Sequence, residues 1–176
     1  MTTQVLLAGF GGQGILFAGK FLAYAGLLEG RQVSWLPSYG PEMRGGTANC
    51  SVVISDEPIG SPVVLAPDIL VAMNLPSYTR FEPDIKPGGM LFADSSLIDV
   101  ECAREDVHAF YAPATQLASD EGLDGLANMI MVGKLLAEAP LLLSETLEAA
   151  MRKTVPPRKA ALLEQNLKAI ALGQSL

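Results

Sequence analysis

Short apolar runs alternate along the first two thirds of the chain with stretches in which apolar residues recur every three or four positions. The runs predict buried strands, and the recurrences predict amphipathic helices. Strands are expected at residues 4–9, 32–36, 48–55, 68–74, 89–96 and 107–113. A helix is expected at residues 15–30, where Gly30 can end it, and a shorter one between the fourth and fifth strands.

Two details of this pattern concern the turns. The residues "DEPIGSP" after the third strand predict a hairpin, with "PVVLA" (62–66) as a candidate partner strand. After Pro113 only helical patterns remain, near residues 115–121, 125–139 and 144–152. A fourth helix is expected to begin after "VPPRK" (155–159) and to run to about residue 172, with Pro156 at its start as a residue favoured there.

Strands that alternate with helices, followed by helices alone, predict an α/β fold with three layers. We expect one domain, residues 1–176, with a mostly parallel or mixed sheet, a Rossmann-like first strand–helix unit and a helical C-terminus. The sequence contains no internal repeat and no linker between two domains.

The composition is that of a globular protein, with 49% apolar and 18% charged residues. The formal net charge of −7 argues against non-specific binding to nucleic acid, which needs basic residues to neutralise phosphates. No apolar run is long enough to span a membrane, and the first residues lack a basic region typical of signal peptides. A cytoplasmic protein is expected.

The chain is poorly supplied with metal ligands. Cys50 and Cys102 are its two cysteines, they form no C-x-x-C pair, and His108 is its one histidine. Iron–sulfur clusters usually take four cysteine ligands, so none is expected on this chain. No metal site and no catalytic acid or base is assigned from the sequence.

A glycine-rich turn follows the first strand. Gly9, Gly11 and Gly14 satisfy the pattern G-x-G-x-x-G between a strand and a helix, where backbone N–H groups and the helix N-terminus can bind a phosphate. The motif lacks the acidic residue that binds a ribose at the end of the second strand in dinucleotide-binding domains. Two other readings stay open: an NAD- or FAD-binding enzyme, and glycines that only allow close helix–strand packing.

The second unusual segment is "SYGPEMRGGTANC", residues 38–50. Arg44 beside Gly45 and Gly46 can present its guanidinium to a phosphate or carboxylate, and Thr47 adds a hydroxyl. Because the segment follows the second strand, we expect it near the glycine-rich turn at one edge of the sheet. The alternative is a surface turn in which Arg44 pairs with Glu42 or another acid.

Taken together, these segments resemble a known family. "GFGGQG", "PSYGPEMRGGTANCSVVISDEPIGSPVV", "PATQLA" and "LANMIMVGKLL" occur in the order and spacing seen in the gamma subunit of 2-oxoacid:ferredoxin oxidoreductases, from about residue 5 to 136. Within that family, the segment "YGPEMRGGTANC" is most similar to the subunit of 2-oxoglutarate enzymes.

The resemblance implies a subunit of an enzyme that oxidatively decarboxylates a 2-oxoacid to an acyl-CoA and passes electrons to ferredoxin. Thiamine diphosphate, magnesium and the iron–sulfur clusters would be bound by partner subunits (alpha, beta and a ferredoxin-like delta), and the isolated chain would be inactive. This chain would help to bind coenzyme A and to close the active site.

The same resemblance directs attention to particular residues. We expect coenzyme A to contact Gly11, Gly12, Gln13 and Gly14, with further contacts from Arg44, Gly45, Gly46 and Thr47. Asn128 is expected either to cap the helix that it begins or to approach these loops. Two alternatives from other classes remain: a free-standing NAD- or FAD-dependent enzyme and a stand-alone coenzyme A-binding module. A complex subunit should also expose apolar surface, through which the isolated chain can self-associate.

Overall fold

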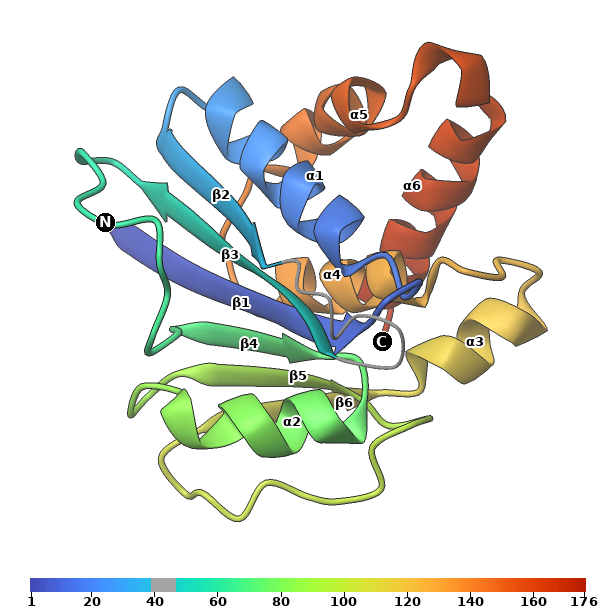
Figure 1. Ribbon diagram of the computed structural model, residues 1–176. Coiled ribbons are helices and arrows are strands. Elements are labelled where there is room, and N and C mark those ends of the chain that lie inside the picture. Colours follow the sequence, from blue (N-terminus) through green and yellow to red (C-terminus); the bar gives the residue numbers. More distant parts are fainter. Residues whose placement is uncertain (39–46) are drawn as a thin grey trace.

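The structure is a computed structural model that describes residues 1–38 and 47–176 (Figure 1). The strands are β1 (Thr2–Phe10), β2 (Gln32–Ser38), β3 (Thr47–Ser55), β4 (Ile69–Ala72), β5 (Met90–Asp94) and β6 (His108–Ala112). The helices are α1 (Ile15–Leu28), α2 (Leu75–Phe81), α3 (Ala114–Asp120), α4 (Ala127–Glu138), α5 (Ser144–Thr154) and α6 (Ala161–Gln174), with short 3₁₀ turns at Glu82–Asp84 and Pro157–Lys159.

The strands form one mixed sheet in the order β2-β3-β1-β4-β5-β6. β1, β4, β5 and β6 are parallel neighbours, whereas β3 runs antiparallel to both β1 and β2. The expected α/β fold with a mixed sheet and a helical C-terminus is confirmed. The alternation of strand and helix carried this prediction because each element has to bury one apolar face against another layer.

The predicted hairpin after the third strand is wrong. Residues 62–66 form no strand, and β3 pairs instead with β1 and β2. Both edges of β3 are therefore already occupied, and Pro62 and Pro67 bring no backbone N–H to a ladder. The segment still covers the sheet, because Val64 is buried and its backbone N–H donates to the Ser51 Oγ at 3.4 Å.

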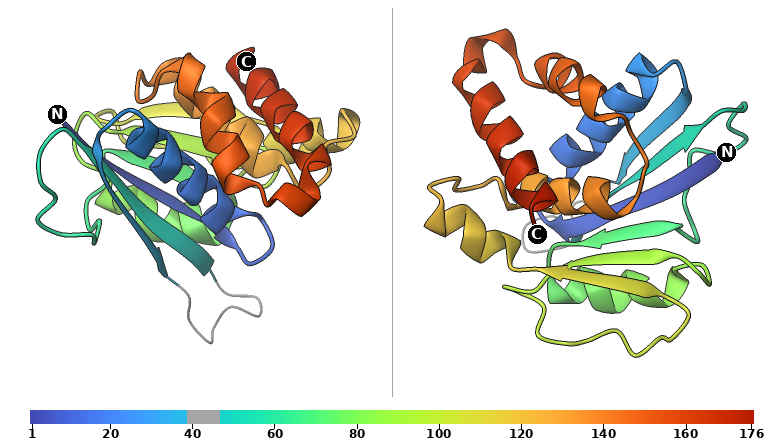
Figure 2. Two further views of the ribbon diagram at one scale, coloured as in Figure 1. Left: turned by 90° about the horizontal axis from the view of Figure 1, so that it is seen from above. Right: turned by 180° about the vertical axis from the view of Figure 1, so that it is seen from behind.

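The two faces of the sheet carry different helices. α1, α4, α5 and α6 lie on one face and α2 on the other (Figures 1 and 2). Successive residues of β1 point to opposite faces, so that Val5 and Leu7 join the larger core and Leu6 joins the smaller one beside Tyr78. β1 is thus buried on both sides, which explains why its sequence is a continuous apolar run.

The C-terminal end of α1 follows the prediction. Its last residue is Leu28, and Gly30 adopts a φ of 74°, which is the left-handed conformation common at helix ends. The carboxylate of Glu29 accepts hydrogen bonds from the Leu143 N–H and the Thr146 Oγ, both at 2.7 Å. Glu29 thereby joins the end of α1 to the start of α5.

The last helix begins after "VPPRK", as predicted. Residues Pro157–Lys159 form a 3₁₀ turn, and α6 begins at Ala161. Pro156 itself lies outside the helix, because the proline that follows holds it in an extended conformation (ψ 140°).

Helix α1 packs closely on the sheet near Gly19. A β-carbon at Gly19 would collide with the Cys50 Sγ and would lie 3.2 Å from the Trp35 Nε1. Cys50 is fully buried, and Trp35 is 36% exposed at the edge strand β2. The missing side chain therefore lets α1 contact β2 and β3 directly.

Helices α4 and α6 are in backbone contact. A β-carbon at Gly133 would overlap the Ile170 carbonyl oxygen, and one at Gly173 would overlap the Ile130 carbonyl oxygen. The Lys134 Nζ also donates to the Leu176 carbonyl at 3.1 Å, which fixes the end of the chain against α4. Neither helix can accept a side chain at this crossing without moving away from the other.

We expect Gly133→Ala to lower the free energy of unfolding by about 2 kcal/mol or more, because the added methyl group meets backbone atoms that have no alternative rotamer. Gly60→Ala is the matched control, since no described atom lies within 4 Å of its β-carbon position. Urea denaturation of the two variants measures the difference. Equal stabilities would show that the two helices do not cross at this distance.

Candidate functional site

The sheet has a point at which its connections change sides. The chain leaving β1 enters α1 on one face, and the chain leaving the neighbouring parallel strand β4 enters α2 on the other (Figure 1). In open α/β sheets, such a change leaves a crevice outside the carboxyl ends of the two strands, and ligands bind there. The glycine-rich turn after β1 lies at this crevice.

The turn, residues 11–14, is a compact link between β1 and α1. The Gln13 N–H donates to the Phe10 carbonyl at 3.2 Å, and Gly12 and Gly14 have φ values of 95° and 71°. Within the described residues, no side chain caps the N-terminus of α1, and its first turn holds no acidic residue. The first N–H groups of this helix are consequently open to an anion.

The side-chain amide of Gln13 forms hydrogen bonds within the chain. Its Oε1 accepts from the Phe10 N–H at 2.6 Å and from the Asn74 Nδ2 at 3.3 Å, while its Nε2 donates to the Met73 carbonyl at 2.9 Å. From the sequence, this amide is expected to contact coenzyme A. In the structure the amide instead joins the end of β1 to the end of β4.

Asn128 approaches the glycine-rich turn, which is one of the two roles left open for it. It is the second residue of α4 and 4% exposed, and its Nδ2 donates to the Gly14 carbonyl at 2.9 Å. The N-cap position is Leu126, so Asn128 does not cap the helix. Its Oδ1 has no hydrogen-bond partner among the described residues.

The contact with Asn128 leaves no room for a side chain at position 14. A β-carbon there would collide with the Asn128 Nδ2, and the φ of 71° is itself unfavourable for other residues. Gly12 is different: its φ is also positive, yet no described atom lies within 4 Å of its β-carbon position. Gly14 is thus required for packing, whereas Gly12 borders open space.

Two hollows meet at Gly12. One, of about 250 Å³, lies at the start of α1 and is lined by Phe10, Gly11, Gly12, Gly14, Ile15, Leu16, Phe17 and Ala48. The other, of about 380 Å³, lies toward α3 and is lined by Gly12, Gln13, Met73, Leu97, Thr115, Ala118, Ser119, Asp124, Gly125 and Ala127. The turn therefore forms a ridge of backbone between the two hollows.

The structure describes only the two ends of the second unusual segment, residues 38–50. Arg44, Gly45 and Gly46 lie outside the described residues. Thr47 opens β3 directly opposite Phe10, and Ser38 pairs with Asn49 in the same ladder region. Both ends of the segment are accordingly at the sheet edge that carries the glycine-rich turn, as expected.

Several residues at this edge are missed by the sequence analysis. Asn74 follows β4, is 2% exposed, and caps α2 by accepting the Ser77 N–H at 2.8 Å. Asp94 ends β5, is fully buried, and accepts from the Thr115 N–H at 3.2 Å and from its hydroxyl. For Asn74 the available signal was an Asn directly after a strand and before a helix, which is typical of caps. Asp94 carried no such signal, because β6 separates it from α3 in the sequence.

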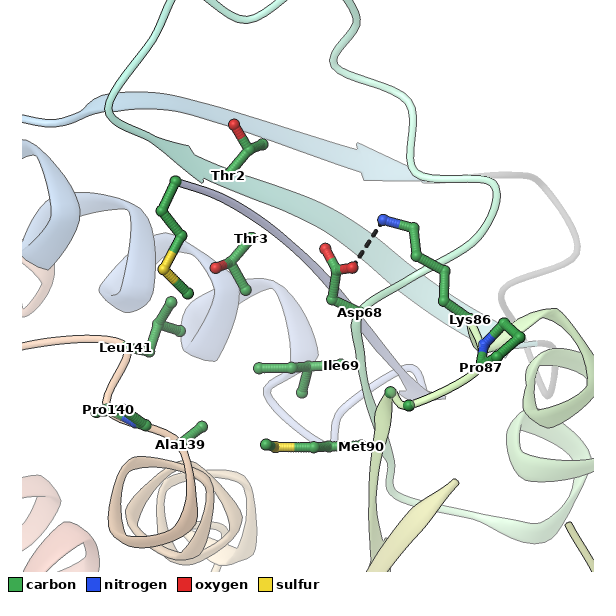
Figure 3. A pocket seen from close by; sticks show the side chains of 13 residues that line it. Thr2, Thr3, Asp68, Ile69, Lys86, Pro87, Met90, Ala139, Pro140 and Leu141 are labelled. Atoms are coloured by element: carbon green, nitrogen blue, oxygen red, sulfur yellow. Dashed lines mark hydrogen bonds and ion pairs between the residues drawn. The ribbon is translucent and has the colours of Figure 1, made fainter. Parts of the chain in front are cut away.

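A further cavity lies at the opposite edge of the sheet, beside the amino ends of β1, β4 and β5 (Figure 3). Its volume is about 290 Å³, and most of its lining is apolar, including Ile69, Met90 and Leu141. Its charged pair is internal: the Lys86 Nζ donates to Asp68 at 2.7 Å, and Asp68 also accepts the Gln4 N–H at 2.7 Å. The crevice at the carboxyl edge is therefore the better candidate site.

The chain is similar to known proteins over nearly its whole length. Residues 4–176 match the protein family described as pyruvate ferredoxin/flavodoxin oxidoreductase. The chain belongs to this family. A 2-oxoglutarate synthase subunit KorC from Methanocaldococcus jannaschii is 39% identical over 98% of this chain and 92% of that protein. A ketoisovalerate oxidoreductase subunit VorA from Methanothermobacter marburgensis is 42% identical over 97% of this chain.

Solved structures of the family have the same fold. The gamma subunit of a keto/oxoacid ferredoxin oxidoreductase from Geobacter sulfurreducens superposes with a TM-score of 0.83 at 29% identity, over 98% of this chain and 96% of that chain. A 2-oxoglutarate:ferredoxin oxidoreductase from Magnetococcus marinus, with 2-oxoglutarate, coenzyme A and succinyl-CoA bound, superposes with a TM-score of 0.87 at 27% identity.

The relatives differ in how much of them this chain covers. It spans 35% of the length of the VorA protein and 30% of the Magnetococcus chain, but nearly the whole of KorC and of the Geobacter gamma subunit. Family members thus carry this domain either as a separate chain or as part of a longer one.

The cysteines of this family member cannot jointly bind an iron–sulfur cluster. Cys50 belongs to the core on the α1 face of the sheet, whereas Cys102 packs against the core on the α2 face. Across residues 1–38 and 47–176, no group of three His, Cys, Asp or Glu side chains is arranged to hold a metal ion. The donor set therefore does not fit a cluster, which usually needs four thiolates.

The reading as an NAD-binding enzyme also finds no support in the position of Glu29. This acid lies at the C-terminal end of α1, whereas the glycine-rich turn lies at its N-terminal end. Its carboxylate accepts hydrogen bonds at the start of α5.

In the described part of the chain, no helix has the length and apolar character needed to cross a membrane.

The two thiols should react with alkylating reagents at very different rates. Burial raises the pKa of Cys50 to about 12, so that at pH 8 roughly one molecule in ten thousand carries the thiolate. Burial and the neighbouring Glu82 also raise the pKa of Cys102, but this side chain is partly exposed. We expect iodoacetamide to modify Cys102 in the native protein and Cys50 only after unfolding.

Peptide mapping by mass spectrometry at timed intervals measures both rates. Cys50→Ala and Cys102→Ser identify the two signals. Modification of Cys50 as rapidly as Cys102 under native conditions would contradict the burial of Cys50 beneath α1.

Proposed function

We propose that this chain is the gamma subunit of a 2-oxoacid:ferredoxin oxidoreductase. In the proposed reaction, a 2-oxoacid and coenzyme A yield an acyl-CoA and carbon dioxide, and two electrons pass to ferredoxin. The observation that carries the proposal is the match over nearly the whole length of both this chain and the KorC and Geobacter gamma subunits. Alpha, beta and ferredoxin-like delta subunits are the proposed partners.

The proposed role of this chain is to bind coenzyme A at the ridge between the two hollows. The groups present fit a phosphate: Gly12 borders open space, and the first turn of α1 offers N–H groups without a side-chain cap among the described residues. Gly11, Gly12 and the start of α1 would hold the phosphates. When bound, coenzyme A supplies the thiol that accepts the acyl group.

The residues around the ridge have separate proposed tasks. Gly14 and Asn128 would fix the start of α1, because the Asn128 amide donates to the Gly14 carbonyl. Arg44, Gly45, Gly46 and Thr47 are proposed to add polar contacts from the neighbouring segment, whose described ends lie at the same sheet edge. A guanidinium among glycines can approach a phosphate without steric hindrance.

Thiamine diphosphate, magnesium and the iron–sulfur clusters are assigned to the partner subunits. The chain has two cysteines, and they lie on opposite faces of the sheet. No step of the decarboxylation or of the electron transfer is therefore attributed to side chains of this subunit. Its own contribution is to bind and orient the acyl acceptor.

For the 2-oxoacid, we propose 2-oxoglutarate as the first substrate to test. KorC proteins match this chain from end to end, and the sequence "YGPEMRGGTANC" is similar to the 2-oxoglutarate type. The VorA proteins are slightly more identical, so ketoisovalerate is the competing substrate.

The coenzyme A site is tested by a matched pair of variants in the assembled enzyme. Gly12→Ala and Gly30→Ala introduce the same methyl group at positive φ values of 95° and 74°, both with open space around the β-carbon position. We expect the KM for coenzyme A to rise about tenfold in Gly12→Ala, as the loss of one or two backbone hydrogen bonds to phosphate would produce.

Gly30→Ala should keep the wild-type KM, because Gly30 lies at the other end of α1. Arg44→Ala is expected to raise the same KM. Wild-type KM values in both Gly12→Ala and Arg44→Ala would refute the proposed site. Thermal unfolding of all variants separates this effect from a loss of stability.

The subunit role is tested by reconstitution. The purified chain should be colourless and inactive, and it should restore coenzyme A-dependent reduction of ferredoxin when mixed with the partner subunits. Assays with 2-oxoglutarate, ketoisovalerate and pyruvate then rank the substrates. A bound flavin, or NAD-linked turnover by the isolated chain, would instead support a free-standing enzyme.

A further inference from the structure

Gln13 occupies an unusual position within the glycine-rich turn. Four of the six residues from Gly9 to Gly14 are glycines, and Phe10 is the other exception. Glycine loses more conformational freedom on ordering than any other residue, so a turn of this composition needs external contacts to hold one shape. The side-chain amide of Gln13 provides such contacts.

The amide connects three structural elements. Its Oε1 accepts from the Phe10 N–H at the end of β1 and from the Asn74 Nδ2, and its Nε2 donates to the Met73 carbonyl after β4. Asn74 in turn uses its Oδ1 to cap α2. The turn is therefore tied across the crevice to the strand and helix on its far side.

The packing beneath the amide is equally tight. A β-carbon at Gly9 would lie 2.7 Å from the Gln13 Oε1 and 2.8 Å from the Ile15 Cδ1. The side chain of Gln13 thus folds back over the strand end, and a residue larger than glycine at position 9 would displace its amide. From the other side, Asn128 holds the Gly14 carbonyl.

We propose that Gln13 is a positioning residue for the phosphates of the bound acyl acceptor. It contacts no phosphate itself, and instead holds the backbone N–H groups of Gly11 and Gly12 in the orientation that a phosphate requires. This inference rests on the proposed function of the site. Preorganised donors bind an anion more tightly than mobile ones, because no ordering cost is left at the moment of binding.

The test uses Gln13→Met in the assembled enzyme, since methionine keeps the length of the side chain and removes all of its hydrogen bonds. We expect the KM for coenzyme A to rise about tenfold, with kcat changed less than about twofold, as for loss of uniform binding. Pantetheine carries the same thiol arm without phosphate, and its KM should stay unchanged. Gln165→Met, on the exposed side of α6, is the matched control.

A second variant keeps the test informative if Gln13→Met assembles poorly. Asn74→Asp retains an oxygen to cap α2 but places a carboxylate oxygen where an N–H faces the Gln13 Oε1. It should raise the KM for coenzyme A in the same way. In the isolated full chain, hydrogen exchange of the Phe10 amide should become faster in Gln13→Met, because this N–H loses its acceptor.

The outcomes distinguish this inference from the proposed function. A wild-type KM for coenzyme A in Gln13→Met and Asn74→Asp, alongside a raised KM in Gly12→Ala, overturns the positioning role and leaves the site intact. Equal increases in KM for coenzyme A and pantetheine also overturn it. Wild-type values in all three variants and in Arg44→Ala overturn both proposals.

Discussion

The hydrogen bonds on both edges of β1 determine where everything else in this domain can lie. On one edge β1 pairs antiparallel with β3 from Thr2 to Phe10, and on the other it pairs parallel with β4. Phe10 therefore stands opposite the start of β3 and close to the end of β4. Because β1 is also buried on both faces, it cannot shift its register without exposing Val5, Leu6 and Leu7. Because the glycine-rich turn directly follows Phe10, its position is fixed by the same strand pairing.

Much of the fold could be read from the sequence, because strand and helix periodicities are properties of local sequence. The strands, the order of the helices and the stop at Gly30 follow from such patterns. The partner of β3 does not, because strand pairing depends on which edges are already occupied. "PVVLA" has the composition of a strand, but β1 and β2 fill both edges of β3, and Val64 covers the sheet face without joining it.

The candidate site was predictable to a similar degree. The turn and its place at the carboxyl edge of the sheet were accessible from motif and order, whereas for Asn128 the sequence left two roles open. The orientation of the Gln13 amide was not, since it depends on Met73 and Asn74, which are sixty residues away in the sequence. A glutamine within a glycine motif carries no signal that tells a ligand contact from a contact to its own backbone. What the turn offers outward is consequently backbone rather than side chain, which suits the proposed role of binding the phosphates of a cosubstrate.

The contact of Trp35 with α1 gives the domain a built-in optical probe. Trp35 is the single tryptophan of the chain, and its half-exposed indole lies beside Gly19 and Cys50 at the edge strand. It stands three residues before Ser38, where β2 ends at the same sheet edge as the glycine-rich turn. Its fluorescence therefore reports from a single known place, without any attached dye, and a thiol quencher already sits next to it.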